Sequence, residues 1–266
     1  ICVQRYISDI KTSSQAPGFA DVLRGTLSLY QFSKKYDYDL YIDATTNPVF
    51  QYFEKNEHYI QRNAEGDIHE LISHTPYDVI DKNLTDLFKT GNSFNVLTNA
   101  FFRTRRDDKG FTNYIGGLAD LEAKTFIHSI LQPTIQIKYS IDNLFNNVYN
   151  ISRQDIYYVF HIRTEDKYVH DETCINLETC NFYLKKLTKL ININENINHI
   201  LITDSKSMGR FWKENEPRLL YWDNDKVHVG DRNGKGEIKD VVIDHCIIRD
   251  AKRIYGNGWS GFSLSA

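Results

Sequence analysis

The sequence predicts an α/β protein with mainly parallel sheets, and two observations lead to this class. Short apolar runs typical of strands alternate along the chain with stretches whose apolar residues recur about every 3.6 positions, as in helices. The run IYYVFHIR at 156–163 is a strand of this kind, and CNFYLKKLTKLI at 180–191 is such a helix. This alternation is the pattern of βα units, whose successive strands pair in parallel.

Length and composition fit one large domain or two small ones. The chain has 266 residues, of which 41% are hydrophobic and 25% charged, values that are ordinary for a globular protein. We predict a first domain at 1–150 and a second at 151–266, because two helices end near 150 and a new βα series begins there.

The first domain is expected to begin with a strand, CVQRYI at 2–7. A loop with Pro17 and Gly18 then opens a helix whose apolar face has helical spacing and consists of Phe19, Val22, Leu23, Thr26, Leu27 and Tyr30. Further strands are expected at 39–43 and 94–98, and two helices, separated by Pro133, at 118–150. Residues 57–93 show too little periodicity for an assignment.

The second domain is easier to interpret. Strands are expected at 156–163, 199–204, 218–222, 226–229 and 253–256, and helices at 180–191, 205–216 and 238–251. The helix at 180–191 should face inward with Tyr183, Leu184, Leu187 and Leu190. The segment at 238–251 is predicted to be helical despite its many β-branched residues.

Charge and hydropathy exclude several classes of protein. The net charge is −3, so no basic field favours nucleic acid, and the cluster RTRR at 103–106 is followed at once by Asp107 and Asp108. No run of about 18 apolar residues predicts a membrane span. The first residues lack the pattern of a signal peptide. We therefore expect a cytoplasmic protein, in the host cytoplasm if the chain is viral.

The four cysteines, Cys2, Cys174, Cys180 and Cys246, are too few for a disulfide scaffold. We interpret them as free thiols in a reducing compartment. Cys174 and Cys180 are the pair for which a local bridge or a metal site stays open, although their spacing matches no standard zinc pattern.

Polar groups follow three predicted strands of the second domain. His161 and Arg163 end one strand, Asp204 ends the next, and GNGWSGFS at 256–263 follows the last. Ligands of open α/β sheets bind outside the carboxyl ends of the strands, so these tips are expected to form one site. Gly261 allows close backbone approach, and the segment 260–263 would offer N–H groups at a helix N-terminus to a phosphate.

Each of these residues also has a structural interpretation. His161 could be a structural histidine whose hydrogen bonds are satisfied within the protein. Asp204 could cap the helix that follows it. Asp244 lies among the apolar positions of a helix, where a carboxylate must be paired or hydrogen-bonded.

Taken in order, HxRxxD at 161–166, TD at 203–204 and SGFSxxA at 260–266 resemble the motifs of the fucosyltransferase superfamily of GT-B glycosyltransferases. This superfamily includes the α1,6-, α1,2- and protein O-fucosyltransferases. The stretch 16–43 is similar to the family's N-terminal glycine loop, helix and second strand. The resemblance implies two Rossmann-like domains with mainly parallel sheets, and the Asn- and Ile-rich stretch 191–200 is compatible with a viral or microbial glycan-building member.

The resemblance also implies roles for single residues. Arg163 would hold the β-phosphate of the donor together with His161. Asp171 would be the catalytic carboxylate, with Glu172 as second choice. The other donor-binding residues it implies are Gly18, Phe19, Asp204, Asp244, Ser260, Gly261, Phe262 and Ser263.

The expected reaction is inverting, metal-independent transfer of a sugar from a nucleotide-sugar, with GDP-fucose favoured, to an oligosaccharide or glycoprotein hydroxyl. The sequence offers no convincing D-x-D motif for a metal, and Arg163 with helix N–H groups can stabilise the leaving diphosphate. Thr164 stands where many members carry a second arginine, and Ser205 where they carry a second acid. A UDP-sugar enzyme such as a xylosyltransferase, and a non-catalytic nucleotide- or glycan-binding protein, therefore stay open as alternatives.

Overall fold

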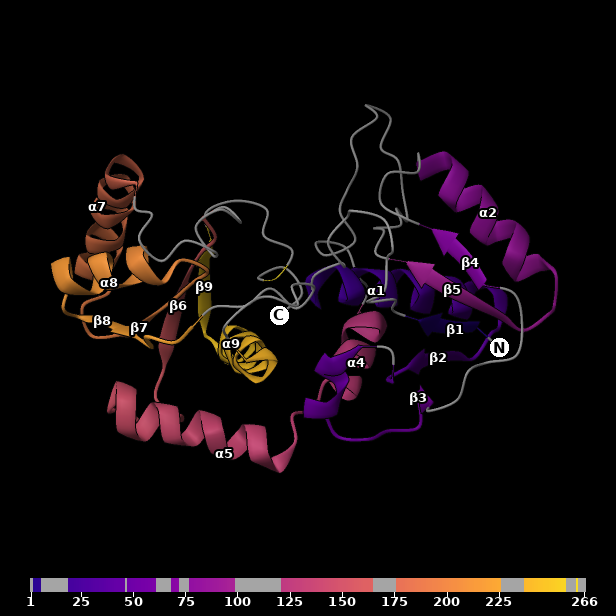
Figure 1. Cartoon of the computed structure of the whole chain (residues 1–266), viewed down its shortest axis with the longest axis horizontal. Coiled ribbons are helices and arrows are strands. Elements are labelled where there is room, and N and C mark those ends of the chain that lie inside the picture. Colours follow the sequence, from indigo (N-terminus) through magenta and orange to yellow (C-terminus); the bar gives the residue numbers. More distant parts are fainter. Residues whose placement is uncertain are drawn as a thin grey trace. The chain divides into compact units, whose positions relative to one another are not determined.

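A computed structural model of the chain divides into two compact units, Ile1–Thr134 and Ile135–Leu264, each drawn in Figure 1. The structure describes residues 2–5, 19–45, 47–60, 68–71, 77–98, 121–164, 176–225, 237–256 and 262. Each unit contains a parallel sheet with helices, so the predicted α/β class with two Rossmann-like halves is confirmed. Among the described residues, no helix is both long enough and apolar enough to cross a membrane.

The first unit is built on a sheet of five parallel strands. In spatial order they are β3 (Tyr59–Ile60), β2 (Leu40–Asp43), β1 (Cys2–Arg5), β5 (Phe94–Thr98) and β4 (Ile68–Leu71). The chain moves outward from β1 through β2 to β3 and returns to the other side of β1, as in mononucleotide-binding folds.

Helix α1 (Phe19–Tyr36) packs on β1 and β2. All six residues of its predicted apolar face are buried, which confirms the helical period of that stretch. The other helices of this unit are the 3₁₀ helix η1 (Pro48–Tyr52), α2 (Tyr77–Lys89) and α4 (Leu121–Ile130). The unassigned region 57–93 thus contains α2 and the two short strands β3 and β4, and these strands have too few residues to show a period.

The second unit holds four parallel strands in the order β8 (Leu219–Tyr221), β7 (Asn198–Thr203), β6 (Tyr157–Ile162) and β9 (Arg253–Gly256). All four were predicted, with small differences at their ends. The further strand predicted at 226–229 lies outside the described residues.

Helices cover both faces of this sheet (Figure 1). On one face, α7 (Leu177–Ile193) and α8 (Lys206–Asn215) enclose a core with Phe160, Leu201 and Trp212. Trp212 is fully buried and donates its indole N–H to the Cys180 carbonyl over 2.9 Å, so its one polar atom is satisfied.

The other face is covered by α9 (Ile238–Asp250), and the α5 helix (Ile135–Asn143) packs against α9. Tyr157 of β6 donates its hydroxyl to the Ile247 carbonyl over 3.0 Å. Five apolar residues of α9 are buried together with His245, and this burial explains why a segment rich in Val and Ile is helical.

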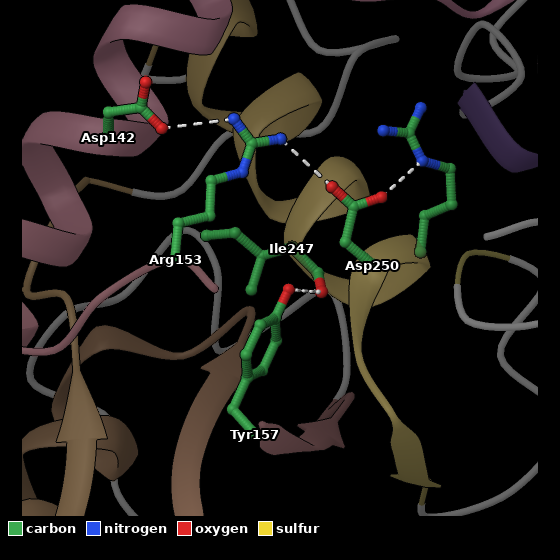
Figure 2. A network of polar contacts seen from close by, with 6 residues as sticks. Asp142, Arg153, Tyr157, Ile247 and Asp250 are labelled. Atoms are coloured by element: carbon green, nitrogen blue, oxygen red, sulfur yellow. Dashed lines mark hydrogen bonds and ion pairs between the residues drawn. The ribbon is translucent and has the colours of Figure 1, made fainter. Parts of the chain in front are cut away.

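An ion-pair network joins α5 and α9 to the segment before β6 (Figure 2). Arg153 donates to Asp142 of α5 over 3.2 Å and to Asp250 of α9 over 3.1 Å. Arg249 pairs with the other oxygen of Asp250 at 2.8 Å. These contacts assign α5 to the second unit.

The division of the chain therefore falls between Thr134 and Ile135, earlier than the predicted junction at 150. Helix α5 and the π-helix η2 (Leu144–Tyr149) contribute the buried residues Ile137, Ile141 and Phe145 to the second unit. Sequence periodicity located these helices but gave no information about the unit on which they pack.

Three cysteines, Cys2, Cys180 and Cys246, are described, and all three are free, as predicted, and buried. Burial raises the pKa of the Cys2 thiol to about 12 and that of Cys180 to about 11, so these thiols stay protonated. Cys174 lies outside the described residues.

Candidate functional site

The direction of the chain changes at β6. From this strand the chain proceeds to β7 and β8 on one side, and β9 then pairs on the other side of β6. A crevice opens at such a switch point, outside the carboxyl ends of the two diverging strands. In this unit those ends are Ile162 of β6 and Gly256 of β9, and His161 lies opposite Gly256 in the register.

His161 is the last residue but one of β6 (Tyr157–Ile162). His161 is buried, and its ring centroid lies 5.7 Å from that of Phe262. Phe262 in turn contacts His245 of α9 at 5.5 Å. The structure thus brings together the HxR stretch and the phenylalanine of the predicted SGFS segment. His161 itself is buried, and its contact with the donor stays a prediction.

Arg163 directly follows β6 and is exposed, with 42% of its side-chain surface accessible. Its Nε lies 3.9 Å from Oδ2 of Asp204, the residue that follows β7. Thr164 donates both its backbone N–H and its hydroxyl to Oδ1 of the same carboxylate, over 2.7 and 2.8 Å. The predicted meeting of the β6 and β7 tips is confirmed for these three residues.

Burial raises the pKa of Asp204 above its ordinary value. The two hydrogen bonds from Thr164 and the charge of Arg163 act in the opposite direction, because they favour the carboxylate. Asp204 does not cap α8, since Ser205 is the N-cap and accepts from the Met208 N–H over 3.4 Å. The alternative of a simple helix cap is therefore wrong.

Asp244 is half-buried on α9. Its negative charge contributes to raising the pKa of Tyr149 and of Tyr221, although burial is the main cause for both phenols. The carboxylate therefore lies close to the core of the second unit. Its expected contact with the base of the donor stays a prediction.

Phe19 is the first residue of α1, and its ring is buried and stacks on Phe53 with centroids 5.9 Å apart. The ring is thus a core element of the first unit. A contact of Phe19 with a donor would have to come from its backbone.

The remaining predicted site residues lie outside the described part of the chain. They are Gly18, Asp171, Glu172, Ser260, Gly261 and Ser263, and their roles stay predictions. Within the described ranges, no three His, Cys, Asp or Glu side chains are grouped as metal ligands would be. Metal independence stays a prediction as well.

Thr164 was treated in the sequence only as a departure from the family pattern. One signal could have identified it: Thr164 lies one residue beyond an exposed arginine at a strand end. There its backbone N–H and its hydroxyl can both donate to an acid that follows the next strand.

No protein-family model and no curated protein matches the sequence. Solved structures do match. The NodZ α-1,6-fucosyltransferase from Bradyrhizobium, crystallised with GDP, aligns with a TM-score of 0.60 at 15% identity, over 100% of this chain and 91% of its own. Arabidopsis thaliana FUT1 in complex with GDP aligns with a TM-score of 0.57 at 10% identity, over 99% of this chain and 68% of its own.

The apo form of POFUT1 aligns with a TM-score of 0.56 at 10% identity, over 99% of this chain and 92% of its own. The chain has the GT-B fold of the fucosyltransferases. This confirms the fold that the motifs implied. In this GT-B chain, the Arg163–Asp204–Thr164 cluster lies at the carboxyl edge of the second sheet, where a parallel sheet binds its ligands.

Proposed function

We propose that this protein is an inverting, metal-independent glycosyltransferase that moves a sugar, fucose from GDP-fucose by preference, to a hydroxyl of an oligosaccharide or glycoprotein. The observation that supports this most directly is the exposed guanidinium of Arg163 at the switch point of the second sheet. A diphosphate is the ligand that such a cation beside a β–α crevice recognises.

The solved structures with the same fold support the nucleotide. NodZ was crystallised with GDP and soaked with GDP-fucose, and Arabidopsis FUT1 was solved with GDP. The sequence motifs around Arg163 and Phe262 resemble those of the same superfamily. Fold and motif therefore favour GDP-fucose over a UDP-sugar.

The proposed chemistry needs a base and a stabiliser for the leaving group. Asp171, or Glu172 in its place, removes the proton of the acceptor hydroxyl as that oxygen forms a bond to the anomeric carbon of the sugar. The bond from this carbon to the diphosphate breaks on the opposite face, and the nucleoside diphosphate leaves with the electron pair. Arg163 and the N–H groups of 260–263 neutralise its charge, which is the work that a metal performs in other transferases.

Calorimetric titration with GDP and with UDP, first with EDTA and then with Mg²⁺ or Mn²⁺, tests the donor. Tight binding of GDP that is indifferent to metal is the expected result. Preference for UDP would replace GDP-fucose by a UDP-sugar such as UDP-xylose on the same fold. Binding of neither nucleotide would overturn the proposal.

Turnover of GDP-fucose separates an enzyme from a non-catalytic binding protein. Asp171→Asn is expected to bind GDP like the wild type but to release no GDP from GDP-fucose, because it cannot turn the donor over. Glu172→Gln is the matched control. If Glu172→Gln loses turnover and Asp171→Asn keeps it, the two roles are exchanged. NMR of the product should show the anomeric configuration inverted relative to the donor.

A further inference from the structure

Asp204 and Thr164 connect the carboxyl ends of β6 and β7, and we call this pair of hydrogen bonds the strand clasp. Both donors of Thr164 reach the same atom, Oδ1 of Asp204, over 2.7 and 2.8 Å. The main-chain bond fixes the backbone immediately after Arg163. The hydroxyl bond fixes the side chain of Thr164, which is half-buried.

The clasp leaves the second carboxylate oxygen for Arg163. Oδ2 of Asp204 is buried and accepts no hydrogen bond from the described part of the chain, and Nε of Arg163 lies 3.9 Å from it. A buried carboxylate oxygen is stabilised by an approaching N–H, so Oδ2 attracts this edge of the guanidinium.

Because the guanidinium is planar, this attraction sets its orientation. Its five N–H donors lie in one plane, and the edge that contains Nε is distinct from the edge with the two terminal nitrogens. If Nε faces Asp204, the edge formed by the two terminal nitrogens is turned away from the carboxylate. They are then presented together, in the arrangement that binds two oxygens of a phosphate.

We propose that Asp204 is a positioning residue, which fixes the end of β6 through Thr164 and aims the guanidinium of Arg163 at the diphosphate of the donor. This inference rests on the proposed function, and it changes the role predicted for Asp204 from donor contact to support of the residue that makes the contact. The same arrangement explains how Thr164 serves where many members have a second arginine, since its two donors hold the carboxylate that orients the first.

Asp204→Asn is the decisive variant, because the amide oxygen can still accept from Thr164 while the negative charge facing Arg163 is lost. We expect it to keep its fold and to bind GDP roughly tenfold more weakly at pH 8, the loss of one charge-assisted contact. The ratio of the two affinities should approach one as the pH falls and the wild-type carboxyl takes up a proton. Protonation of GDP itself changes both affinities equally and therefore cancels in this ratio.

Asp142→Asn is the matched control, because it also removes an acid from an arginine pair of the second unit, at 3.2 Å from Arg153. It should bind GDP like the wild type. Equal GDP affinity of Asp204→Asn and wild type at pH 8 would overturn the proposal, and so would a ratio that does not change with pH.

Hydrogen exchange of the Thr164 amide examines the clasp without any ligand. The amide should be protected in the wild type and in Asp204→Asn and should lose protection in Asp204→Ala.

If Asp204→Asn does not fold, Thr164→Val replaces it, with Thr164→Ser as its control, and the loss of GDP affinity should then be smaller than tenfold. A wild type that binds no GDP but protects this amide refutes the proposed function and leaves the clasp intact.

Discussion

Arg163 and Thr164 are neighbours in the chain, but the end of β6 gives them different partners. Arg163 is exposed at the edge of the sheet, whereas Thr164 turns back to the carboxylate of Asp204. A substitution at the first position should therefore change ligand binding, and one at the second should change the local backbone first.

We expect Arg163→Ala to weaken GDP binding by roughly ten- to a hundredfold, the usual value of a hydrogen-bonded charge. Arg163→Lys should restore part of the affinity, because it keeps the charge but loses the bidentate geometry. Arg253→Ala is the control, since Arg253 is an exposed cation at the amino ends of the strands of the same sheet. A calorimetric titration in which Arg163→Ala and Arg253→Ala bind alike would contradict the assignment.

Gly209 of α8 packs so closely against Tyr221 that the position has no room for a side chain. A Cβ at this position would lie 2.7 Å from Cε2 of Tyr221, well inside van der Waals contact. We expect Gly209→Ala to lower the free energy of unfolding by about 1–3 kcal/mol, the cost of overpacking a core. Glu214→Ala, on the exposed side of the same helix, should change it by less than about 0.5 kcal/mol. Urea denaturation of both variants provides the comparison.

At the scale of single elements, β6, β7 and β9 share an aromatic cluster. His199 of β7 stacks on Phe160 of β6, with ring centroids 5.4 Å apart and planes at 11°. Phe160 also stacks on Tyr255 of β9 at 5.3 Å. Burial lowers the pKa of His199, and the charge of Arg218 lowers it further, while the carboxylate of Glu216 acts against both.

The lowered pKa makes the second unit sensitive to acid. Above its ordinary pKa of 6.5, His199 is neutral in both the folded and the unfolded chain. Below that value the unfolded chain binds the proton first, so the free energy of unfolding decreases by up to about 1.4 kcal/mol per pH unit. The decrease ends once the pH falls below the folded pKa.

His199→Phe keeps the stacked ring and removes the titration. Its free energy of unfolding should therefore depend less on pH between 6.5 and 5 than that of the wild type. Urea denaturation at several pH values measures this difference, and equal slopes for the two proteins would show that His199 contributes nothing. Other titrating groups are common to both proteins and cancel in the comparison.

At the scale of the whole molecule, the second unit begins at Ile135 rather than at the predicted junction near 150. We expect a fragment of residues 135–266 to unfold cooperatively. A fragment of residues 151–266 lacks Ile137, Phe145 and Tyr149, which are buried in this unit, and should be much less stable. Thermal melts of the two fragments decide between the boundaries, and equal melting temperatures would favour the later one.

Most of the elements could be predicted because their signals are local. The apolar periods of α1, α7 and α9 and the apolar runs of β5, β6 and β7 are written in consecutive residues. The short strands β3 and β4 were not assigned, since two to four residues carry too little pattern and depend on their neighbours in the sheet.

The sequence by itself determined the α/β class, the order of strands and helices, and the motif that identifies Arg163 as the candidate phosphate ligand. These features depend on residue type and spacing along the chain. Only the tertiary structure decided that β9 returns to the side of β6, that Thr164 binds Asp204, and that α5 belongs to the second unit. Each of these joins residues distant in the chain, and such contacts leave no periodic trace because they arise when separate elements pack together.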